Sequence, residues 1–191
     1  MLNTKRFTNM QIHYFIPILI CVLVLNMPSI AQTKQEEIQA IRVSYNQINE
    51  ERHFTTKKLE NEEYLDHMPD GGGELTGYYK GDTLYKITDW IGISSGVIKD
   101  EYYFDKGRLI FFYEVQSRFG FNDTLQERDY SKQKVVFERR YYIHNGILIH
   151  SVKSGKSFET SSNLSNAAMQ KELLDEAKQY SSLLKVKGRR G

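Results

Sequence analysis

Two segments, one near each end of the chain, carry apolar residues at helical spacing. The first runs from Lys34 to about Arg52, and the second from about Ser165 to Lys185. The apolar positions of the first are Ile38, Ile41, Tyr45 and Ile48. Those of the second are Leu173, Ala177, Tyr180 and Leu184. Spacings of three and four residues place such side chains on one face of a helix, so the sequence predicts two amphipathic helices.

Between the helices, one short pattern typical of β-hairpins occurs three times. Each copy has a tyrosine pair, a turn that contains glycine, and a strand that begins with or near a leucine. The copies span Tyr78–Leu84, Tyr102–Leu109 and Tyr141–Leu148. Asn145-Gly146, in the third copy, is the strongest of the three turn signals, because both residues tolerate positive φ. The pattern predicts antiparallel strands joined by tight turns.

Together these elements predict an α+β fold. We expect an antiparallel β-meander of about six or seven strands, packed by an N-terminal and a C-terminal α-helix that share one apolar face. The first strand is expected near Thr55 and Thr56. The polar stretch from Gly120 to Lys134, which precedes the third hairpin, is predicted to be a surface loop.

The second hairpin can be given a register. A turn closed over Lys106-Gly107 pairs Phe104 with Leu109, Tyr102 with Phe111 and Asp100 with Tyr113 on one face. The same reasoning over Asn145-Gly146 pairs Tyr141 with His150 and Glu138 with Lys153. A bulge beside the turn would change both registers.

The other face of the second hairpin would carry Tyr103, Ile110 and Phe112. A solvated sheet face is normally polar, and exposed apolar patches often mark interaction sites. These three residues are therefore the candidate binding surface. Four candidates could cover this surface: the 120–134 loop, the segment 53–70, a second copy of the protein, or a ligand. Trp90 joins the candidates because it could stack on a sugar, although core packing is its more ordinary role.

The first thirty residues resemble a secretory signal peptide. Lys5 and Arg6 precede an apolar run of about 12 residues, shorter than the roughly 20 of a spanning helix, and Ser29-Ile30-Ala31 matches a cleavage site. We expect residues 1–31 to be a signal peptide, 32–187 a single domain and 188–191 a basic tail. The protein would then be exported, to the periplasm or beyond, with no stable membrane span after cleavage.

Composition excludes several kinds of chemistry for the exported part. The chain has 26 basic and 24 acidic residues, and two of the basic ones lie in the signal segment, so the remainder is electrically balanced and gives no argument for nucleic acid binding. The single cysteine, Cys21, also lies in that segment. Thiolate zinc sites and cysteine nucleophiles are therefore excluded. The remaining histidines lack metal-site spacing, and Gly71-Gly72-Gly73 precedes a strand instead of a helix, so we expect no metal and no cofactor.

The order of motifs resembles a group of small exported bacterial proteins of unassigned activity. The resemblance rests on an Ile-Arg-x-x-Tyr-x-x-Ile core in the first helix, on GGELTGYY, EYYFDKGRLIFFYE and RYYIHNGILI, and on a Leu-Leu-x-x-Ala-Lys stretch in the last helix. It covers about Ile38 to Leu184. Hairpin motifs are specific for a fold, so the resemblance implies fold and export and carries over no catalytic residue.

Three functions remain open. The first is a non-enzymatic binding or interaction protein of the cell envelope, whose partner is an envelope protein or an apolar or saccharide ligand. The alternative is an envelope hydrolase with an unrecognised polar site near the 120–134 loop. The third is a structural protein that pairs through a sheet edge. A concave pocket with converging acids would favour the enzyme, and a flatter aromatic surface the binding module.

Overall fold

The computed structural model describes residues 30–158 and 165–190. Nearly all of the predicted signal peptide, residues 1–31, lies outside this part of the chain. The chain divides after Glu36 into two compact units. The buried core and the cavities described below all belong to the second unit, residues 37–191.

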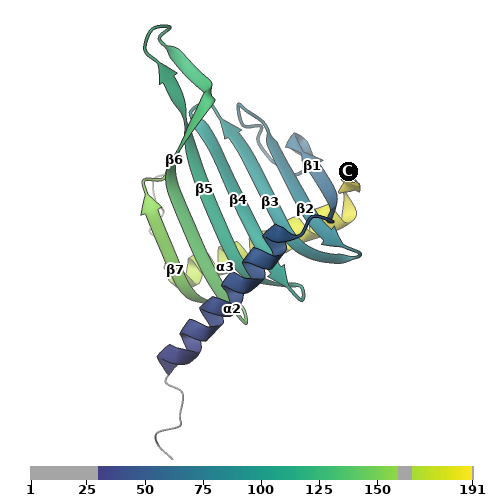
Figure 1. Cartoon of the computed structure of the whole chain (residues 1–191). Coiled ribbons are helices and arrows are strands. Elements are labelled where there is room, and N and C mark those ends of the chain that lie inside the picture. Colours follow the sequence, from purple (N-terminus) through teal and green to yellow (C-terminus); the bar gives the residue numbers. More distant parts are fainter. Residues whose placement is uncertain (1–29, 159–164, 191) are drawn as a thin grey trace, which may run out of the picture. The chain divides into compact units, whose positions relative to one another are not determined.

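The described chain contains two α-helices and a series of strands (Figure 1). The helices are α2 (Ile30–Glu50) and α3 (Asn166–Val186). The strands before the long central hairpin are β1 (Thr55–Glu60), β2 (Gly73–Lys80), β3 (Thr83–Ile93) and β4 (Gly96–Asp105), with a 3-10 turn, η1 (Asn61–Glu63), after β1. The remaining strands are β5 (Arg108–Asn122), β6 (Glu127–His144), β7 (Ile147–Gly155) and the two-residue β8 (Arg189–Arg190).

The strands form one antiparallel sheet in the order β7-β6-β5-β4-β3-β2-β1-β8. The predicted α+β fold is confirmed, with a meander of seven long strands and a helix at each end. The first strand begins at Thr55, as predicted. The backbone of the basic tail is not a free end, because Arg189 and Arg190 pair with Lys58 and Lys57 of β1.

The two helices cover opposite faces of the sheet, so the prediction that they share one face is wrong (Figure 1). On the α3 face, Leu173, Ala177 and Leu184 pack against a buried cluster from the strands. That cluster includes Leu59, Leu75, Ile87, Tyr102, Phe104, Leu109, Phe112, Tyr141 and Ile143. On the α2 face, the helix residues Ile38, Ile41 and Ile48 pack against Tyr103, Phe111 and Tyr142.

A β-bulge occurs at the same place in each of the three repeated hairpins. The register shifts between Tyr78 and Tyr79, between Tyr103 and Phe104, and between Tyr142 and Ile143. In each case one residue of the following strand has no partner opposite it. These residues are Tyr85, Ile110 and Ile149, and all three pack against the α2 cluster. A bulge places two successive side chains on the same side, so every residue beyond it changes face.

The bulges correct both predicted registers. Phe104 pairs with Leu109 as expected, but Tyr102 pairs with Phe112 and Tyr103 with Phe111. Phe111 therefore lies under α2 with Tyr103, and Phe112 lies under α3 with Tyr102. The prediction had placed Phe111 with Tyr102 and Phe112 with Tyr103. In the third hairpin the same shift pairs Tyr142 with His150, Arg139 with Lys153 and Glu138 with Ser154.

The turns themselves are as the sequence predicts. Lys106 and Gly107 have φ of 49° and 75°, and Asn145 and Gly146 have φ of 50° and 77°. Positive φ at both central residues is typical of the two-residue turns that match strand twist.

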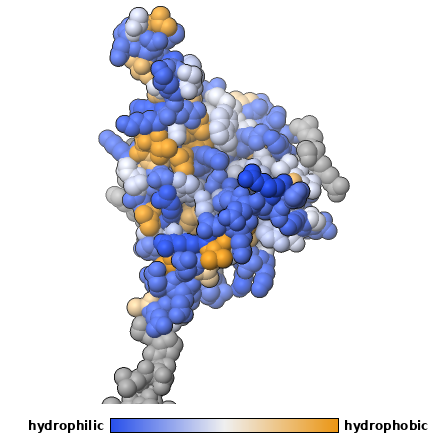
Figure 2. Space-filling model, viewed as in Figure 1, coloured by the Kyte–Doolittle hydropathy of each residue, from blue (hydrophilic) through white to orange (hydrophobic). Residues whose placement is uncertain are grey.

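The stretch from Gly120 to Lys134 was predicted to be a loop, and most of it is strand. β5 and β6 continue through it as a two-stranded arm that extends past the other strands in Figure 1. The arm carries the exposed apolar side chains Phe121, Leu125 and Tyr130. Figure 2 shows further hydrophobic surface between the arm and α2, and exposed apolar residues of the strands include Trp90, Val135 and Val152.

The burial of Phe112 gives a direct test of the corrected register. Phe112→Asp replaces a buried ring with a buried carboxylate, and Arg139, the guanidinium beside that ring, is already paired with Glu114. The substitution should therefore cost more than about 4 kcal/mol of unfolding free energy. Phe121→Asp, the matched change on the exposed arm, should stay within about 0.5 kcal/mol of the parent. Urea denaturation followed by circular dichroism measures both. A Phe112→Asp protein as stable as the parent would contradict this register.

Candidate functional site

A row of charged residues crosses the sheet beneath α3. Cross-strand pairing places Asp89 of β3 opposite Asp100 of β4, Asp100 opposite Glu114 of β5, Glu114 opposite Arg139 of β6, and Arg139 opposite Lys153 of β7. Directly opposite residues have Cβ atoms about 4.5–5.5 Å apart. Three acids are therefore followed by two bases along one line, which we call the charged row.

A cavity of about 770 Å³ lies between this row and the N-terminal half of α3. We call it the α3 cavity. The row contributes Asp100, Glu114, Arg139 and Lys153, and α3 contributes Met169, Glu172, Leu173 and Glu176. The remaining walls are Ile98, Phe112, Phe137, Tyr141, Gly155, Lys156, Ser157 and Phe158. Its volume is within the range of small-molecule sites.

Asp89, at one end of the row, has its partners within the protein. Its carboxylate accepts hydrogen bonds from the hydroxyls of Tyr64 at 2.8 Å and Tyr180 at 2.9 Å. Burial raises the pKa of Asp89, and these two donors oppose the rise. Asp89 therefore joins α3 and the β1–β2 connection to the sheet, and it has a structural role.

Glu114 and Arg139, in the middle of the row, form an ion pair. Gln116 Nε2 also donates to Glu114 Oε1 at 2.5 Å. The Arg139 guanidinium carbon lies 5.6 Å from the centroid of the Phe112 ring and 5.3 Å from that of Tyr141. Both charges are thus held by the protein itself, and the stacked aromatic rings fix the plane of the guanidinium.

Asp100 Oδ1 is buried and has no hydrogen-bond partner among the described residues. The same holds for Arg139 Nε and the Tyr141 hydroxyl, and for Glu114 Oε2, which contacts Arg139 in the ion pair. Protein atoms surround the carboxyl closely, and burial raises its pKa well above the usual range. The nearby carboxylates of Glu114, Asp89 and Glu176 raise the pKa further, and only Arg139 lowers it. Buried polar atoms are almost always paired, so this oxygen requires an explanation.

Glu176 approaches Asp100 from α3. Its carboxylate accepts a hydrogen bond from the Tyr102 hydroxyl at 2.7 Å and one from the Tyr180 hydroxyl at 3.4 Å. Burial raises the pKa of Glu176, and these donors oppose it. The acid-rich end of the cavity is thus enclosed by side chains of both the sheet and the helix.

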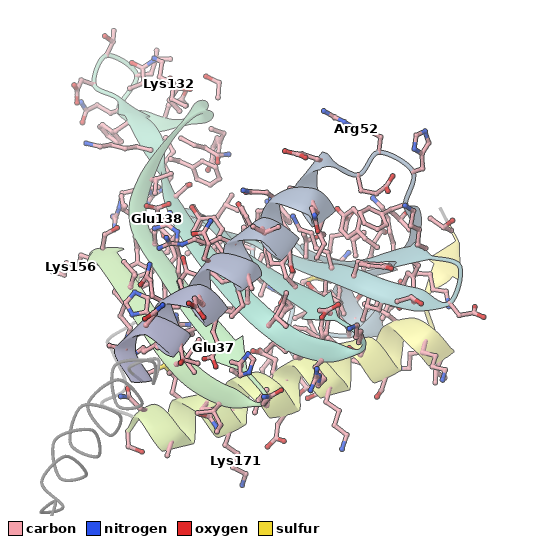
Figure 3. The ribbon with its side chains drawn as sticks, turned by 60° about the horizontal axis from the view of Figure 1, so that its bottom comes forward. Glu37, Arg52, Lys132, Glu138, Lys156 and Lys171 are labelled. Carbon is pink, nitrogen blue, oxygen red and sulfur yellow. The ribbon has the colours of Figure 1, made fainter. Side chains whose placement is uncertain are left out.

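The other end of the cavity is basic and open. Lys153 and Lys156 are exposed, and Lys153 Nζ lies 5.9 Å from the centroid of the Tyr141 ring. Figure 3 shows Lys156 at the β7 edge of the sheet. The α3 cavity therefore runs from an enclosed acidic end to an exposed basic end.

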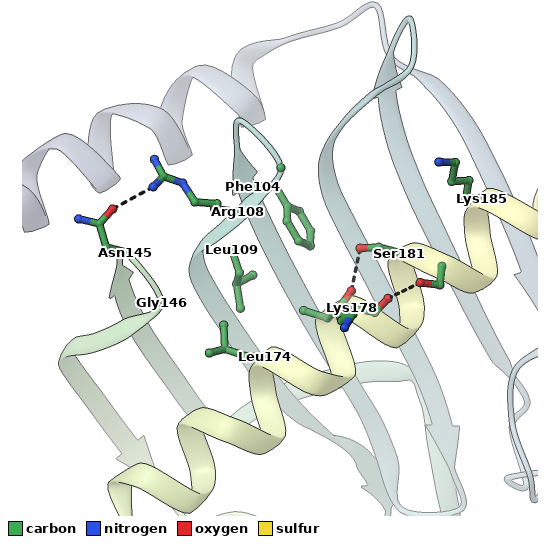
Figure 4. Close-up of a pocket in the computed structure, with 12 residues that line it drawn as sticks. Phe104, Arg108, Leu109, Asn145, Gly146, Leu174, Lys178, Ser181 and Lys185 are labelled. Carbon is green, nitrogen blue, oxygen red and sulfur yellow. Dashed lines mark hydrogen bonds between the residues drawn. The ribbon is translucent and has the colours of Figure 1, made fainter.

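A second hollow of about 690 Å³ lies beside the C-terminal half of α3 (Figure 4). Several of its polar groups form hydrogen bonds within the protein: Ser181 and Ser182 donate to the carbonyls of Ala177 and Lys178, and Arg108 donates to Asn145. Its floor includes Phe104, Leu109 and Leu174. Among the described residues, no buried polar atom of this hollow lacks a hydrogen-bond partner. Unlike the α3 cavity, it therefore has no unpaired group that a ligand could satisfy.

The structure separates the four residues that the sequence put forward as binding residues. Tyr103 is fully buried under α2, and its hydroxyl donates to Glu101 at 2.5 Å. Ile110 is half-buried in the same cluster. The cover of these two residues is α2, which was not among the covers considered.

The other two residues lie elsewhere. Phe112 is buried on the opposite face, stacks on Tyr141 with ring centroids 5.9 Å apart, and lines the α3 cavity. Trp90 is 38% exposed and lines a smaller hollow of about 350 Å³ with Gly71–Glu74. Tyr103, Ile110, Phe112 and Trp90 therefore do not form one surface.

The sequence reasoning missed the charged row, although one signal was available. Asp100 fell on the apolar face of the second hairpin in the predicted register, and an acid among apolar neighbours is unusual. Glu114, Arg139 and Lys153 could not be placed beside it, because the bulges move them relative to the predicted pairing.

Comparisons with protein-family models, with curated proteins and with solved structures gave no match. In the part of the chain that the structure describes, no helix is both long and apolar enough to cross a bilayer. Over the same residues, His, Cys, Asp and Glu side chains form no group of three that could hold a metal ion.

Asp100 should reduce stability, and increasingly so as the pH rises. Because its pKa is raised in the folded state, the folded protein keeps a proton that the unfolded chain has lost, and stability falls as the pH passes through that interval. Asp100→Asn removes the charge at nearly constant shape. It should be more stable than the parent at neutral pH by about 1–3 kcal/mol, with a smaller gain in acid.

Urea denaturation at acidic and neutral pH measures this difference. Asp82→Asn, which removes an exposed acid from a turn, is the control and should show no such pH-dependent gain. A neutral-pH stability of Asp100→Asn equal to or below that of the parent would contradict an unpaired acid at position 100.

Proposed function

We propose that this protein is an exported binding protein and that the α3 cavity is its ligand site. The observation that carries the proposal is the unpaired, buried Oδ1 of Asp100 in a cavity of ligand size. A buried acceptor without a partner costs about 1–3 kcal/mol. A ligand that donates a hydrogen bond to it would offset that cost on binding.

The walls of the cavity add a second property of the ligand. Phe112, Phe137, Tyr141 and Phe158 give it an aromatic lining, and Leu173 and Met169 close it from α3. Sites of this kind combine apolar area, which supplies affinity, with a few polar groups, which set orientation. The ligand we infer is therefore a small molecule with a hydrogen-bond donor and an apolar or flat body.

Export is part of the proposal and rests on the sequence. A basic start, a short apolar run and small residues before position 32 are typical of a cleaved signal. The repeated hairpin motifs, which resemble those of small exported bacterial proteins, support the same location. In this proposal the binding site works in the periplasm or outside the cell.

Hydrolysis is the second candidate function, and one observation favours it. Asp100 and Glu114 are directly opposite each other on neighbouring strands. Most glycoside hydrolases use a pair of carboxyl groups in a concave site as their catalytic residues. Binding is the better supported function, because Arg139 and Gln116 already hold Glu114. Glu114 is therefore not free to act as a base or a nucleophile.

The two candidates give different results in a turnover assay. A hydrolase should release nitrophenol from p-nitrophenyl glycosides, and Asp100→Asn should lower the rate by at least about a hundredfold. The binding function predicts no release above background by either protein. Release that depends on Asp100 would establish the second candidate in place of the first.

A matched pair of substitutions on α3 tests the location of the site. Glu172 lines the cavity and Asp175 does not, and both are exposed acids on the same helix. Glu172→Trp should therefore block the cavity without unfolding the protein, and Asp175→Trp should leave it open.

The measurement is saturation-transfer NMR of the full chain with glucose, N-acetylglucosamine, putrescine and trialanine, which offer hydroxyl, amide and ammonium donors. At least one probe should bind the parent and Asp175→Trp and lose its signal with Glu172→Trp. Binding of no donor class, or equal binding to both variants, would contradict the proposed function.

A further inference from the structure

The charged row is arranged as a dipole with a neutral centre. Asp89 is satisfied by Tyr64 and Tyr180, and Glu114 is paired with Arg139. The acids Asp100, Glu172 and Glu176 and the bases Lys153 and Lys156 line the cavity without an ion pair to another described residue. Asp100, next to Glu176, lies at the enclosed end, and Lys153 and Lys156 lie at the open end.

The enclosed end suits a cation better than a hydroxyl. The carboxylates of Asp89, Glu114 and Glu176 act on Asp100 from β3, β5 and α3, and Arg139 is the single cation that acts on it. A neutral donor would leave this excess of negative charge in place. An ammonium group offsets it and donates to Oδ1 in a charge-assisted hydrogen bond, which is about twice as strong as a neutral one.

The open end suits an anion. Lys153 and Lys156 line the cavity from β7 and from the residue after it. No ion pair to a carboxylate of the described residues is formed by either lysine, whereas other basic side chains on the sheet, such as Lys86 and Arg140, have such partners. A carboxylate at this end would meet two cations and remain near water.

The distance between the two ends sets the size of the ligand. Asp100 and Lys153 are three strands apart, about 14 Å at the usual strand spacing. The Lys153 ammonium lies over the Tyr141 ring, one strand nearer to Asp100 and two residues along β6 from the row, which reduces the span to about 12 Å. An extended tripeptide covers about 10–11 Å, and its uncharged peptide groups would lie over the neutral Glu114–Arg139 pair.

We propose that the α3 cavity binds a short peptide with free ends, its ammonium group at Asp100 and its carboxylate at Lys153 and Lys156. The inference rests on the proposed function and names the class of ligand. The aromatic walls contact the peptide side chains. Asp100 and the two lysines bind the two charged ends, and their positions fix the direction in which the peptide lies.

The full chain is titrated calorimetrically with trialanine, N-acetyl-trialanine, trialanine amide and glucose. Acetylation removes the ammonium group and should weaken binding about ten- to a hundredfold. Amidation removes the carboxylate and should weaken binding about two- to fivefold, because the lysines are exposed to water. Affinity for trialanine should rise with pH, because Asp100 binds an ammonium group more strongly once it has lost its proton, and affinity for N-acetyl-trialanine should not.

The variants assign each end of the peptide. Asp100→Asn should bind trialanine and N-acetyl-trialanine equally, and the pH dependence should disappear. The double variant Lys153→Gln, Lys156→Gln should no longer distinguish trialanine from its amide. Lys171→Gln, on the side of α3 that does not line the cavity, should behave as the parent (Figure 3).

The outcomes separate this inference from the proposed function. Glucose that binds the parent and is lost with Glu172→Trp, while trialanine does not bind, would overturn the peptide inference and leave a binding site in the α3 cavity. Trialanine that binds no better than its acetylated form would also overturn it. Failure of every probe to bind the parent would overturn both proposals.

Discussion

The repeated β-bulge is the constraint on which the two-sided core depends. A regular strand sends alternate side chains to opposite faces, so a hairpin with one apolar face leaves the other polar. Here the extra residue beside each turn places two neighbours, such as Ile110 and Phe111, on the α2 face. The next residue, Phe112, returns to the α3 face. One sheet thereby supplies apolar surface to both helices.

The charged row lies at the limit of that apolar surface. On each of the adjacent strands β4, β5 and β6, the acid or base of the row lies two residues beyond an aromatic residue of the α3 face, on the side away from the hairpin turns. Glu114 and Arg139 form an ion pair, whereas Asp100 has a buried oxygen without a hydrogen-bond partner and no ion pair among the described residues. An unpaired buried acid lowers the free energy of unfolding, and residues that destabilise a protein in this way are concentrated in functional sites.

Local pattern was sufficient to predict the elements and insufficient to predict their faces. The helices, the three turns and the strand at Thr55 follow from periodicity and from turn residues, which act over a few positions. The bulges depend on how each strand packs against a helix that is far away in sequence. No local sequence pattern near Ile110 or Ile149 therefore predicts them. Because a shift of one residue exchanges the faces, Phe111 was grouped with Tyr102 and Phe112 with Tyr103, and the row from Asp100 to Lys153 was not predicted.

The connection of α3 has a consequence for how the protein is made. α3 begins after β7, contacts strands from β7 to β1, and is followed by β8, which pairs with β1 at the far edge of the sheet. Residues 166–190, which are made after all the strands of the meander, therefore close the fold over one of the first strands. Until they emerge, the apolar face that α3 covers has no partner in the chain, and half of the core cannot form. In a chain of this design, the α3 half of the core is therefore completed only after all seven strands of the meander have been made.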